Sequence, residues 1–336
     1  MAGRVSGKVA FITGAARGQG RSHAVRLAEE GADIIAVDIA EDIASVRRFY
    51  PGATEADLAE TVKEVEALGR SIVAIKADVR DYDALKKALD DGVAQLGHVD
   101  IVSANAAIWI FGDLAHEVAE GDWQDLIDVN LTGVWHTAKA AIPHLIAQGT
   151  GGSIIITSST AGLKGTPHSV QYVTSKHAVI GLMRTLAMEL APHSIRVNTV
   201  NPTGVDTIMI QNEATWRLFL PDVEHPTREQ AAEVFMPTNA LPVPWVEPRD
   251  VSNAVLFLAR TRHATSPAPH CLSTPVTPSS KKARTRATRR LCCLQPSPAR
   301  GHGRAVRPLA RDACLAGARR AGLRPRHSLR AGARSR

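Results

Sequence analysis

The chain has 336 residues and a formal net charge of +7, but it joins two different compositions. From residue 260 to the end there are 19 Lys and Arg against one acid, Asp312, which leaves 21 basic and 32 acidic residues in the first 259. The acidic first part is long enough for a large core, and because the chain has neither a run of about 18 apolar residues nor an apolar leader, we expect no transmembrane helix and no secretion.

The N-terminal stretch predicts a buried strand, a glycine-rich turn and a helix, in that order. Val9–Ile12 is an apolar run, Gly14, Gly18 and Gly20 space a turn, and apolar residues then recur at helical intervals up to Gly31. Glycines here let the backbone approach a pyrophosphate, while the first helical N–H groups face the anion. The spacing is not Gly-x-Gly-x-x-Gly, so a glycine turn in some other α/β protein remains an alternative.

A second apolar strand, Ile34–Val37, ends in Asp38. This acid follows the glycines by about 20 residues, where a dinucleotide site needs a carboxylate for the ribose hydroxyls. Arg17 would favour the 2′-phosphate of NADP, whereas Asp38 would repel it. Because Asp38 is expected at the ribose itself, the sequence predicts NAD as the cofactor.

The chain then alternates between strands and helices up to residue 259. After an irregular stretch at 41–51, we expect strands at 71–77, 98–104, 151–157 and 194–200, and helices at 54–68, 81–96, 122–148, 171–191 and 248–259. The alternation predicts a single α/β domain with a doubly wound, Rossmann-like parallel sheet covered on both faces. Residues 201–246 do not show this alternation of strands and helices. Their aromatic residues among prolines are typical either of a lid over an active site or of an ordinary packed loop.

Tyr172 and Lys176 stand four residues apart on a predicted helix, so their side chains share one face. Ser159 follows the strand at 151–157, at the edge where open α/β sheets bind ligands. A phenol has a pKa of about 10, and a neighbouring ammonium favours its ionised form. We therefore expect Tyr172 to accept the proton of an alcohol that loses a hydride, with Ser159 bonded to the substrate oxygen and Lys176 also holding the nicotinamide ribose. Such a Tyr/Lys pair is common on helix surfaces, so the serine and the glycine turn carry this assignment.

Over residues 5–259 the chain resembles the short-chain dehydrogenases/reductases. TGAARGQG at 13–20 matches the cofactor loop of that family, Asp78-Val79 its adenine-contacting pair, and Asn105-Ala106 its Asn-Ala-Gly segment. The resemblance implies a catalytic tetrad of Asn130, Ser159, Tyr172 and Lys176. It also implies a cofactor site made of Gly14, Arg17, Gly18, Gln19, Gly20, Asp38, Asp78, Val79, Asn105, Tyr172, Lys176 and Thr203.

Asn130 has two interpretations. The resemblance implies that it holds a water that relays the proton from Lys176 to solvent. From the residues alone, it is a polar side chain within a helix, bonded to backbone.

The chain is more closely similar to the mycofactocin-associated branch of this family, which includes carveol dehydrogenase-like proteins. This resemblance rests on four segments: the insertion after Asp38, ITSSTAGLKG at 156–165, and residues 201–203 and 210–214. It implies a tightly held NAD, a mycofactocin-type redox carrier derived from a peptide, and a homotetramer or homodimer. We expect an apolar, terpenoid-like secondary alcohol or ketone as substrate, with contacts from Trp109, Ile110, Phe111, Met209, Trp216 and Phe219.

The tail from residue 260 departs from the family. The sequences of relatives usually end with a seventh strand, whose sequence is similar to DEARYVTGATLPVDAG. A coding sequence for that peptide, read one base later, gives the sixteen residues of Thr261–Val276. We therefore expect a one-base deletion or sequencing error near the codon of Arg260, with the loss of the last edge strand and a disordered basic tail over 260–336.

Three rival functions are weighed against this prediction. The basic cluster at 281–286 could bind nucleic acid nonspecifically, although no recognition motif accompanies it. The body could be a nucleotide-binding redox sensor without catalysis, against which the intact Ser159, Tyr172 and Lys176 argue, or an inactive truncation product. All four cysteines lie beyond residue 259 in spacings that match no zinc site. We expect a cytoplasmic protein with no metal, no specific nucleic-acid partner and no membrane association.

Overall fold

The computed structural model describes residues 3–260, which are built on one parallel sheet. Its strands follow the order β3-β2-β1-β4-β5-β6. The expected doubly wound, Rossmann-like sheet is confirmed, whereas the expected loss of a seventh strand and the expected disordered tail fall on residues 261–336, outside the described residues. The strands are β1 (Val9–Thr13), β2 (Asp33–Asp38), β3 (Ile72–Lys76), β4 (Ile101–Ala104), β5 (Gly152–Thr157) and β6 (Ile195–Val200).

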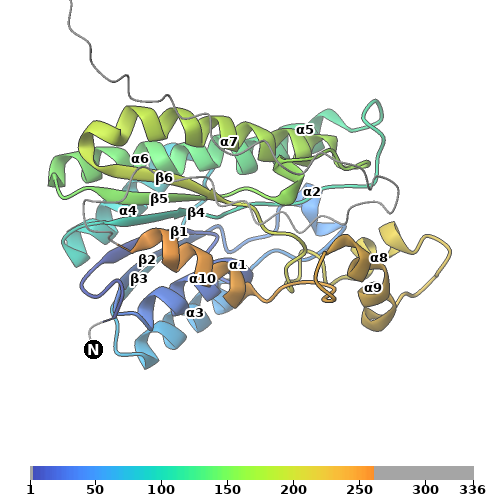
Figure 1. The fold of residues 1–336 in the computed structure, drawn as a ribbon, viewed down its shortest axis with the longest axis horizontal. Helices are drawn as coiled ribbons and strands as arrows, with labels where there is room; N and C mark the ends of the chain where they lie inside the picture. The colour runs from blue at the N-terminus through green and yellow to red at the C-terminus, as the bar shows by residue number, and fades with distance from the viewer. Residues whose placement is uncertain (1–2, 261–336) are drawn as a thin grey trace, which may run out of the picture. The chain divides into compact units, whose positions relative to one another are not determined.

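Helices cover both faces of the sheet (Figure 1). Because successive side chains of a strand point to opposite faces, β1 serves two cores: Val9 and Phe11 lie in one, and Ala10 and Ile12 in the other. One layer contains α1 (Gly18–Ala28), α3 (Glu55–Ala67) and α10 (Pro248–Ala259), and the opposite layer contains α4 (Tyr82–Leu96), α6 (Gly133–Gln148) and α7 (Val170–Leu190).

Local signals at the helix ends agree with the sequence. Thr54 caps α3 as expected, because its hydroxyl accepts a hydrogen bond from Asp57 N while the Asp57 carboxylate accepts one from Thr54 N. Gly31, which follows α1, has a φ of +92°, a conformation that favours glycine.

The long helix expected at 122–148 is interrupted. α5 (Glu120–Ile127) passes into a π-helical turn, η1 (Asp128–Thr132), before the chain continues as α6. Such turns are rare and often lie at functional sites. Five residues are too few to reveal a change in the apolar period, which explains why the sequence predicted one continuous helix.

Two irregular stretches contain short helices beyond the carboxyl ends of the strands (Figure 1). α2 (Ala44–Arg47) is a single turn in the insertion after β2. The segment after β6 contains α8 (Glu213–Phe219), α9 (Arg228–Phe235) and the 3-10 turn η4 (Met236–Thr238). Further 3-10 turns are η2 (Thr160–Gly162) and η3 (Ala191–His193).

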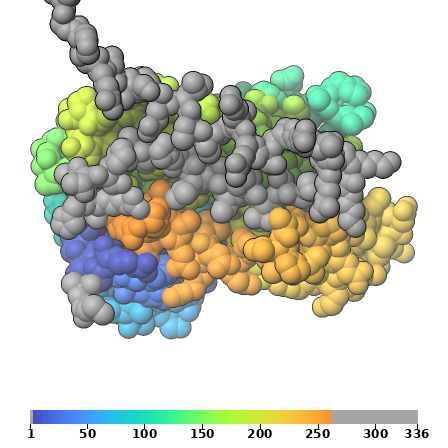
Figure 2. All heavy atoms as spheres, in the orientation of Figure 1, coloured from blue at the N-terminus to red at the C-terminus, as the bar shows by residue number. Residues whose placement is uncertain are grey.

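Helix α10 is fastened to α1, and Figure 2 shows its orange surface against the blue N-terminal part. Ser252 Oγ bonds His23 Nδ1 at 2.8 Å and donates to Pro248 O at 2.9 Å. His23 is fully buried, and its Nε2 has no partner in the described part of the chain. Burial lowers the pKa of His23 to about 3, so the imidazole is neutral at physiological pH.

Candidate active site

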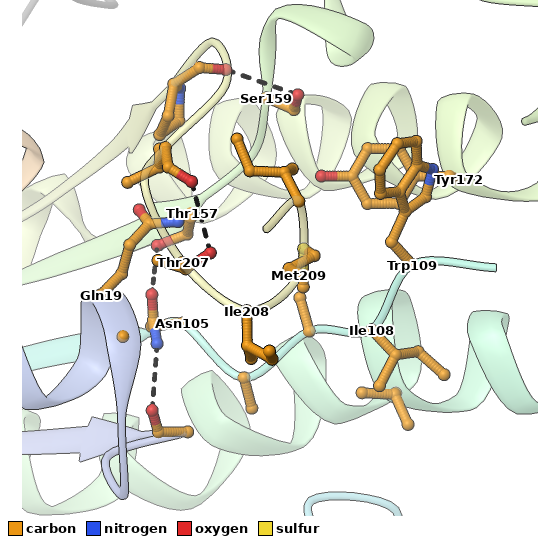
Figure 3. Close-up of a pocket in the computed structure, with 18 of the residues that line it drawn as sticks. Gln19, Asn105, Ile108, Trp109, Thr157, Ser159, Tyr172, Thr207, Ile208 and Met209 are labelled. Atoms are coloured by element: carbon orange, nitrogen blue, oxygen red, sulfur yellow. Dashed lines mark hydrogen bonds between the residues drawn. The ribbon is translucent and has the colours of Figure 1, made fainter. Parts of the chain in front are cut away.

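A cleft of about 400 Å³ lies at the carboxyl ends of β1, β2 and β5 (Figure 3). From β1 the chain adds β2 and β3 towards one edge of the sheet, and from β4 it adds β5 and β6 towards the other edge. Ligands of open α/β sheets bind where the strand order reverses in this way, which is here between β1 and β4. The volume suits a small organic ligand. The walls come from the glycine turn, the insertion after β2, and the segments that follow β4, β5 and β6.

The glycine turn fits the pyrophosphate of a dinucleotide. Gly14 and Gly18 have φ values of +68° and +55°, which favour glycine, and a Cβ on Gly20 would lie 1.9 Å from Gly14 O. The turn therefore keeps its backbone open to the cleft where α1 begins. Gln19 Oε1 is buried and has no partner among the described residues, so it is an acceptor available to a ligand.

Asp38 lies where a ribose needs a carboxylate. Its Oδ2 accepts a hydrogen bond from Ala16 N and its Oδ1 one from Ala40 N, each at 2.9 Å. These bonds orient the side chain at the wall of the cleft and leave further lone pairs for ribose hydroxyls. All twelve expected cofactor residues line this one cleft: Gly14, Arg17, Gly18, Gln19, Gly20, Asp38, Asp78, Val79, Asn105, Tyr172, Lys176 and Thr203.

Arg17 has contacts that the sequence did not indicate. Its guanidinium donates to Pro51 O at 2.5 Å and to Gly52 O at 2.9 Å. Two of its donors thus hold the insertion against the glycine turn. The sequence indicated Arg17 only as a cation that would favour a 2′-phosphate against the opposing effect of Asp38, and it did not predict these bonds to backbone carbonyls.

The catalytic candidates meet at the other end of the cleft. Tyr172 and Lys176 share one face of α7, Ser159 follows β5, and Figure 3 shows the Tyr172 hydroxyl pointing into the cavity on the side of Ser159. The Lys176 side chain is buried, its Nζ donates to Thr157 O at 2.9 Å, and Nζ lies 5.5 Å from the centre of the Tyr172 ring.

Burial controls the protonation of this pair. It lowers the pKa of Lys176 to about 7 and raises the pKa of Tyr172 above its ordinary value of 10, an effect that the Ser159 hydroxyl opposes. This differs from the expectation that the Lys176 cation lowers the pKa of Tyr172. The physical reason is that both groups lose hydration, which disfavours the charged form of each.

Asn130 is fully buried within η1 and is not among the residues that line the cleft. Its Oδ1 accepts from Ile108 N and its Nδ2 donates to Ile108 O, each at 2.8 Å. The side chain therefore holds the loop after β4, whose Ile108 and Trp109 do line the cleft. A water held by Asn130 stays a prediction.

The expected substrate contacts divide into two groups. Trp109, Met209 and Phe219 line the cleft, whereas Ile110, Phe111 and Trp216 do not. The Phe111 ring contacts those of Phe49 and Trp109, with centroids 4.6 and 4.4 Å away, so it packs against the lining residue Trp109 without lining the cleft itself. Sequence reasoning missed lining residues in the insertion, which shows no apolar period: Ile39, Ile43, Val46 and Tyr50.

Among residues 3–260, no cluster of three or more His, Cys, Asp or Glu side chains could hold a metal ion. None of the helices described in that range is long and apolar enough to span a bilayer.

Comparison with known proteins agrees with this geometry. Residues 8–218 match the family model of the short chain dehydrogenases. The chain is 56% identical to the (-)-trans-carveol dehydrogenase of Rhodococcus erythropolis, over 76% of this chain and 91% of the relative. A carveol dehydrogenase from Mycobacterium avium, solved in complex with NAD, matches with a TM-score of 0.75 and 56% identity, over 77% of this chain and 92% of that one. A short chain dehydrogenase from Mycobacterium paratuberculosis bound to NAD has a TM-score of 0.69 and 46% identity, over 77% and 93%.

Proposed function

This chain belongs to the short chain dehydrogenase family and is an NAD-dependent alcohol dehydrogenase or ketoreductase, and we propose that its substrate is an apolar, terpenoid-like secondary alcohol or the matching ketone. One observation carries the proposal: Ser159, Tyr172 and Lys176 line the same cleft as the glycine turn and Asp38. The apolar side chains of Trp109 and Met209 in that cleft, and the carveol dehydrogenases among the relatives, support the substrate class.

The residues divide the binding of the cofactor among them. The glycine turn and Gln19 receive the pyrophosphate, Asp38 the ribose hydroxyls, and Asp78 and Val79 the adenine, while Asn105 and Thr203 line the path to the nicotinamide. When bound, NAD supplies the acceptor for the hydride of the substrate carbon.

The protein handles the proton. In ketone reduction the neutral Tyr172 hydroxyl donates its proton to the carbonyl oxygen, and in alcohol oxidation Tyr172 accepts the hydroxyl proton of the alcohol as the phenolate, after its own proton has left. Ser159 donates a hydrogen bond to the substrate oxygen and thereby stabilises the charge that develops there. Lys176, with a pKa of about 7, can take up and release a proton near neutral pH, so it can renew the protonation state of Tyr172.

Further parts of the proposal concern the setting of this site. We propose that NAD is held tightly, that a mycofactocin-type redox carrier reoxidises it, and that the chain forms a homotetramer or homodimer. We also propose a cytoplasmic location, since all four cysteines lie beyond residue 259. The domain organisation proposed is a dinucleotide-binding domain over 1–259, followed by a basic tail.

The test uses the full chain, purified without added nucleotide. Mass spectrometry after gentle denaturation should detect released NAD and no NADP. Incubation with trans-carveol should then produce NADH absorbance and the ketone. Protein that retains NAD but leaves a series of apolar cyclic alcohols unchanged would contradict the substrate class, and folded protein that binds no NAD would contradict the cofactor assignment.

A further inference from the structure

Tyr50 is a buried residue of the insertion that no step of the reaction above uses. It lies three residues after the end of α2, has an exposed fraction of 5%, and lines the cleft. Its neighbour Phe49 contacts the ring of Phe111, which belongs to the loop after β4. The insertion therefore reaches the substrate end of the cleft as well as the glycine turn.

The hydroxyl of Tyr50 holds the backbone of the loop after β4. It accepts a hydrogen bond from Trp109 N at 3.0 Å. The preceding residue, Ile108, is held at both its N–H and its C=O by Asn130. The Asn130 side chain thus fixes Ile108, and the Tyr50 side chain, from a different segment, fixes the next residue, Trp109. The bond to Trp109 N depends on the phenol oxygen of Tyr50.

Trp109 is the residue that this bond places beside the reacting centre. Figure 3 shows its indole next to the Tyr172 ring, and the two ring centroids are 6.1 Å apart. The indole Nε1 donates to Ser169 Oγ at 3.3 Å, and the Phe111 ring supports the indole at 4.4 Å. A shift of the Trp109 backbone would therefore move the apolar wall nearest to Tyr172.

We propose that Tyr50 is a positioning residue that determines the substrate specificity of this site, because its hydroxyl fixes the Trp109 wall against which a bulky apolar alcohol packs beside Tyr172. The inference rests on the proposed function and extends it from the catalytic groups to the insertion. A small alcohol that does not reach Trp109 gains nothing from Tyr50, whereas a cyclic one depends on it.

The state of the Tyr50 hydroxyl suits this task. Burial raises its pKa, so the group stays neutral over the working pH range and its oxygen remains an acceptor for Trp109 N–H. Its own proton has no acceptor among residues 3–260, which leaves a donor for a polar group of a bound ligand.

The chain offers a matched set of variants, because it contains three tyrosines: Tyr50, Tyr82 and Tyr172. Tyr50→Phe removes the hydroxyl and keeps the ring. Tyr82→Phe makes the same change on α4, outside the cleft, and serves as the control. With trans-carveol, we expect Tyr50→Phe to raise KM about tenfold with kcat changed less than about twofold, whereas kcat/KM for 2-propanol stays as in the wild type. Tyr82→Phe should match the wild type with both alcohols.

A second measurement separates this inference from the proposed function. Isothermal titration of the NADH-loaded proteins with trans-carveol measures binding without turnover, because NADH cannot accept a hydride from the alcohol, and the Tyr50→Phe protein should bind it about tenfold more weakly at an unchanged NADH affinity. If the wild type oxidises and binds trans-carveol and Tyr50→Phe does so equally well, the inference on Tyr50 is overturned and the proposed function stands. An equal loss for both alcohols would also overturn it, since that indicates general damage. A wild type that neither binds nor oxidises trans-carveol overturns the proposed substrate class.

Discussion

Lys176 and Tyr172 show how burial shapes single residues of the cleft. The four-residue spacing on a helix was enough to predict that both side chains share a face, and the structure confirms that both line the cleft. The spacing could not predict their pKa values, because these depend on how completely the fold removes water from each group. The contacts of Arg17 and Tyr50 were not predicted for a similar reason, since their partners are backbone atoms of segments distant in sequence.

Replacement of Tyr172 by Phe should abolish proton transfer while leaving the fold intact. The ring remains, but no group at this position can accept the alcohol proton, so we expect kcat to fall by about 10²–10⁴-fold. NAD binding, measured by titration, should change little. A Tyr172→Phe protein that keeps more than a tenth of the wild-type kcat would show that another group takes the proton.

Replacement of Asp38 by Ala should weaken NAD binding by about 10–100-fold, because hydrogen bonds from ribose hydroxyls to a carboxylate are lost. The affinity for NADP should change less, since the charge that repels its 2′-phosphate is removed as well. Titration with both cofactors measures the ratio. Asp38→Asn is the control for the bonds to Ala16 N and Ala40 N, because an amide oxygen keeps one acceptor there. An unchanged preference in Asp38→Ala would remove this residue from the role.

At the scale of elements, apolar patterns in the sequence were enough to predict the strands and most helices. They were not enough to predict the π-helical turn and the short helices. The six strands and the cap at Thr54 follow from runs and end signals that are local in sequence. The π-helical turn η1 was missed, because its five residues are too few to reveal a change in the apolar period. The short helices α8 and α9 were missed because segments of seven and eight residues give too few periods.

The junction of α1 and α10 predicts a loss of stability in mild acid. The pKa of His23 is about 3 in the folded chain, against an ordinary value of 6.5. Between these values the unfolded chain binds the extra proton, so the free energy of unfolding is at its full value above pH 6.5 and falls as the pH drops towards 3. From pH 6.5 to pH 5 the loss should be about 2 kcal/mol.

Urea unfolding of the wild type and of a His23→Asn variant at these two pH values measures the effect. Asparagine keeps a polar partner for Ser252 but does not titrate, so the variant should lose much less stability over the same interval. The interval lies above the range in which carboxylates take up most of their protons. Equal losses in the two proteins would show that His23 is not the group responsible.

At the scale of the whole molecule, the sheet brings the ends of separate segments to one cleft. The family and the fold could be predicted from the sequence because the glycine turn, Asp38 and the Ser159/Tyr172/Lys176 set have fixed spacings and a parallel sheet collects them at one edge. The path of the insertion across that edge could not be predicted from the sequence, because this path depends on contacts that form only after folding.

The coding sequence decides the nature of residues 261–336. We expect sequencing of the gene to show that one added base near the codon of Arg260 restores a reading frame encoding a peptide similar to DEARYVTGATLPVDAG. A chain expressed from the restored frame should have a higher thermal midpoint, because a seventh strand would extend the sheet. A gene whose codons for Thr261–Val276 encode no such peptide in the shifted frame would rule this explanation out.

Residues 50–52 are anchored on both sides, at Trp109 through Tyr50 and at Arg17 through Pro51 and Gly52. Movement of residues 50–52 away from the cleft would require these three bonds to break together, and we expect this to slow the exchange of a bound nucleotide with the cellular pool. Under the proposed function the nicotinamide would then behave as a prosthetic group, reduced and reoxidised where it sits. Each catalytic cycle would then need an oxidant small enough to reach the bound nicotinamide through the substrate end of the cleft.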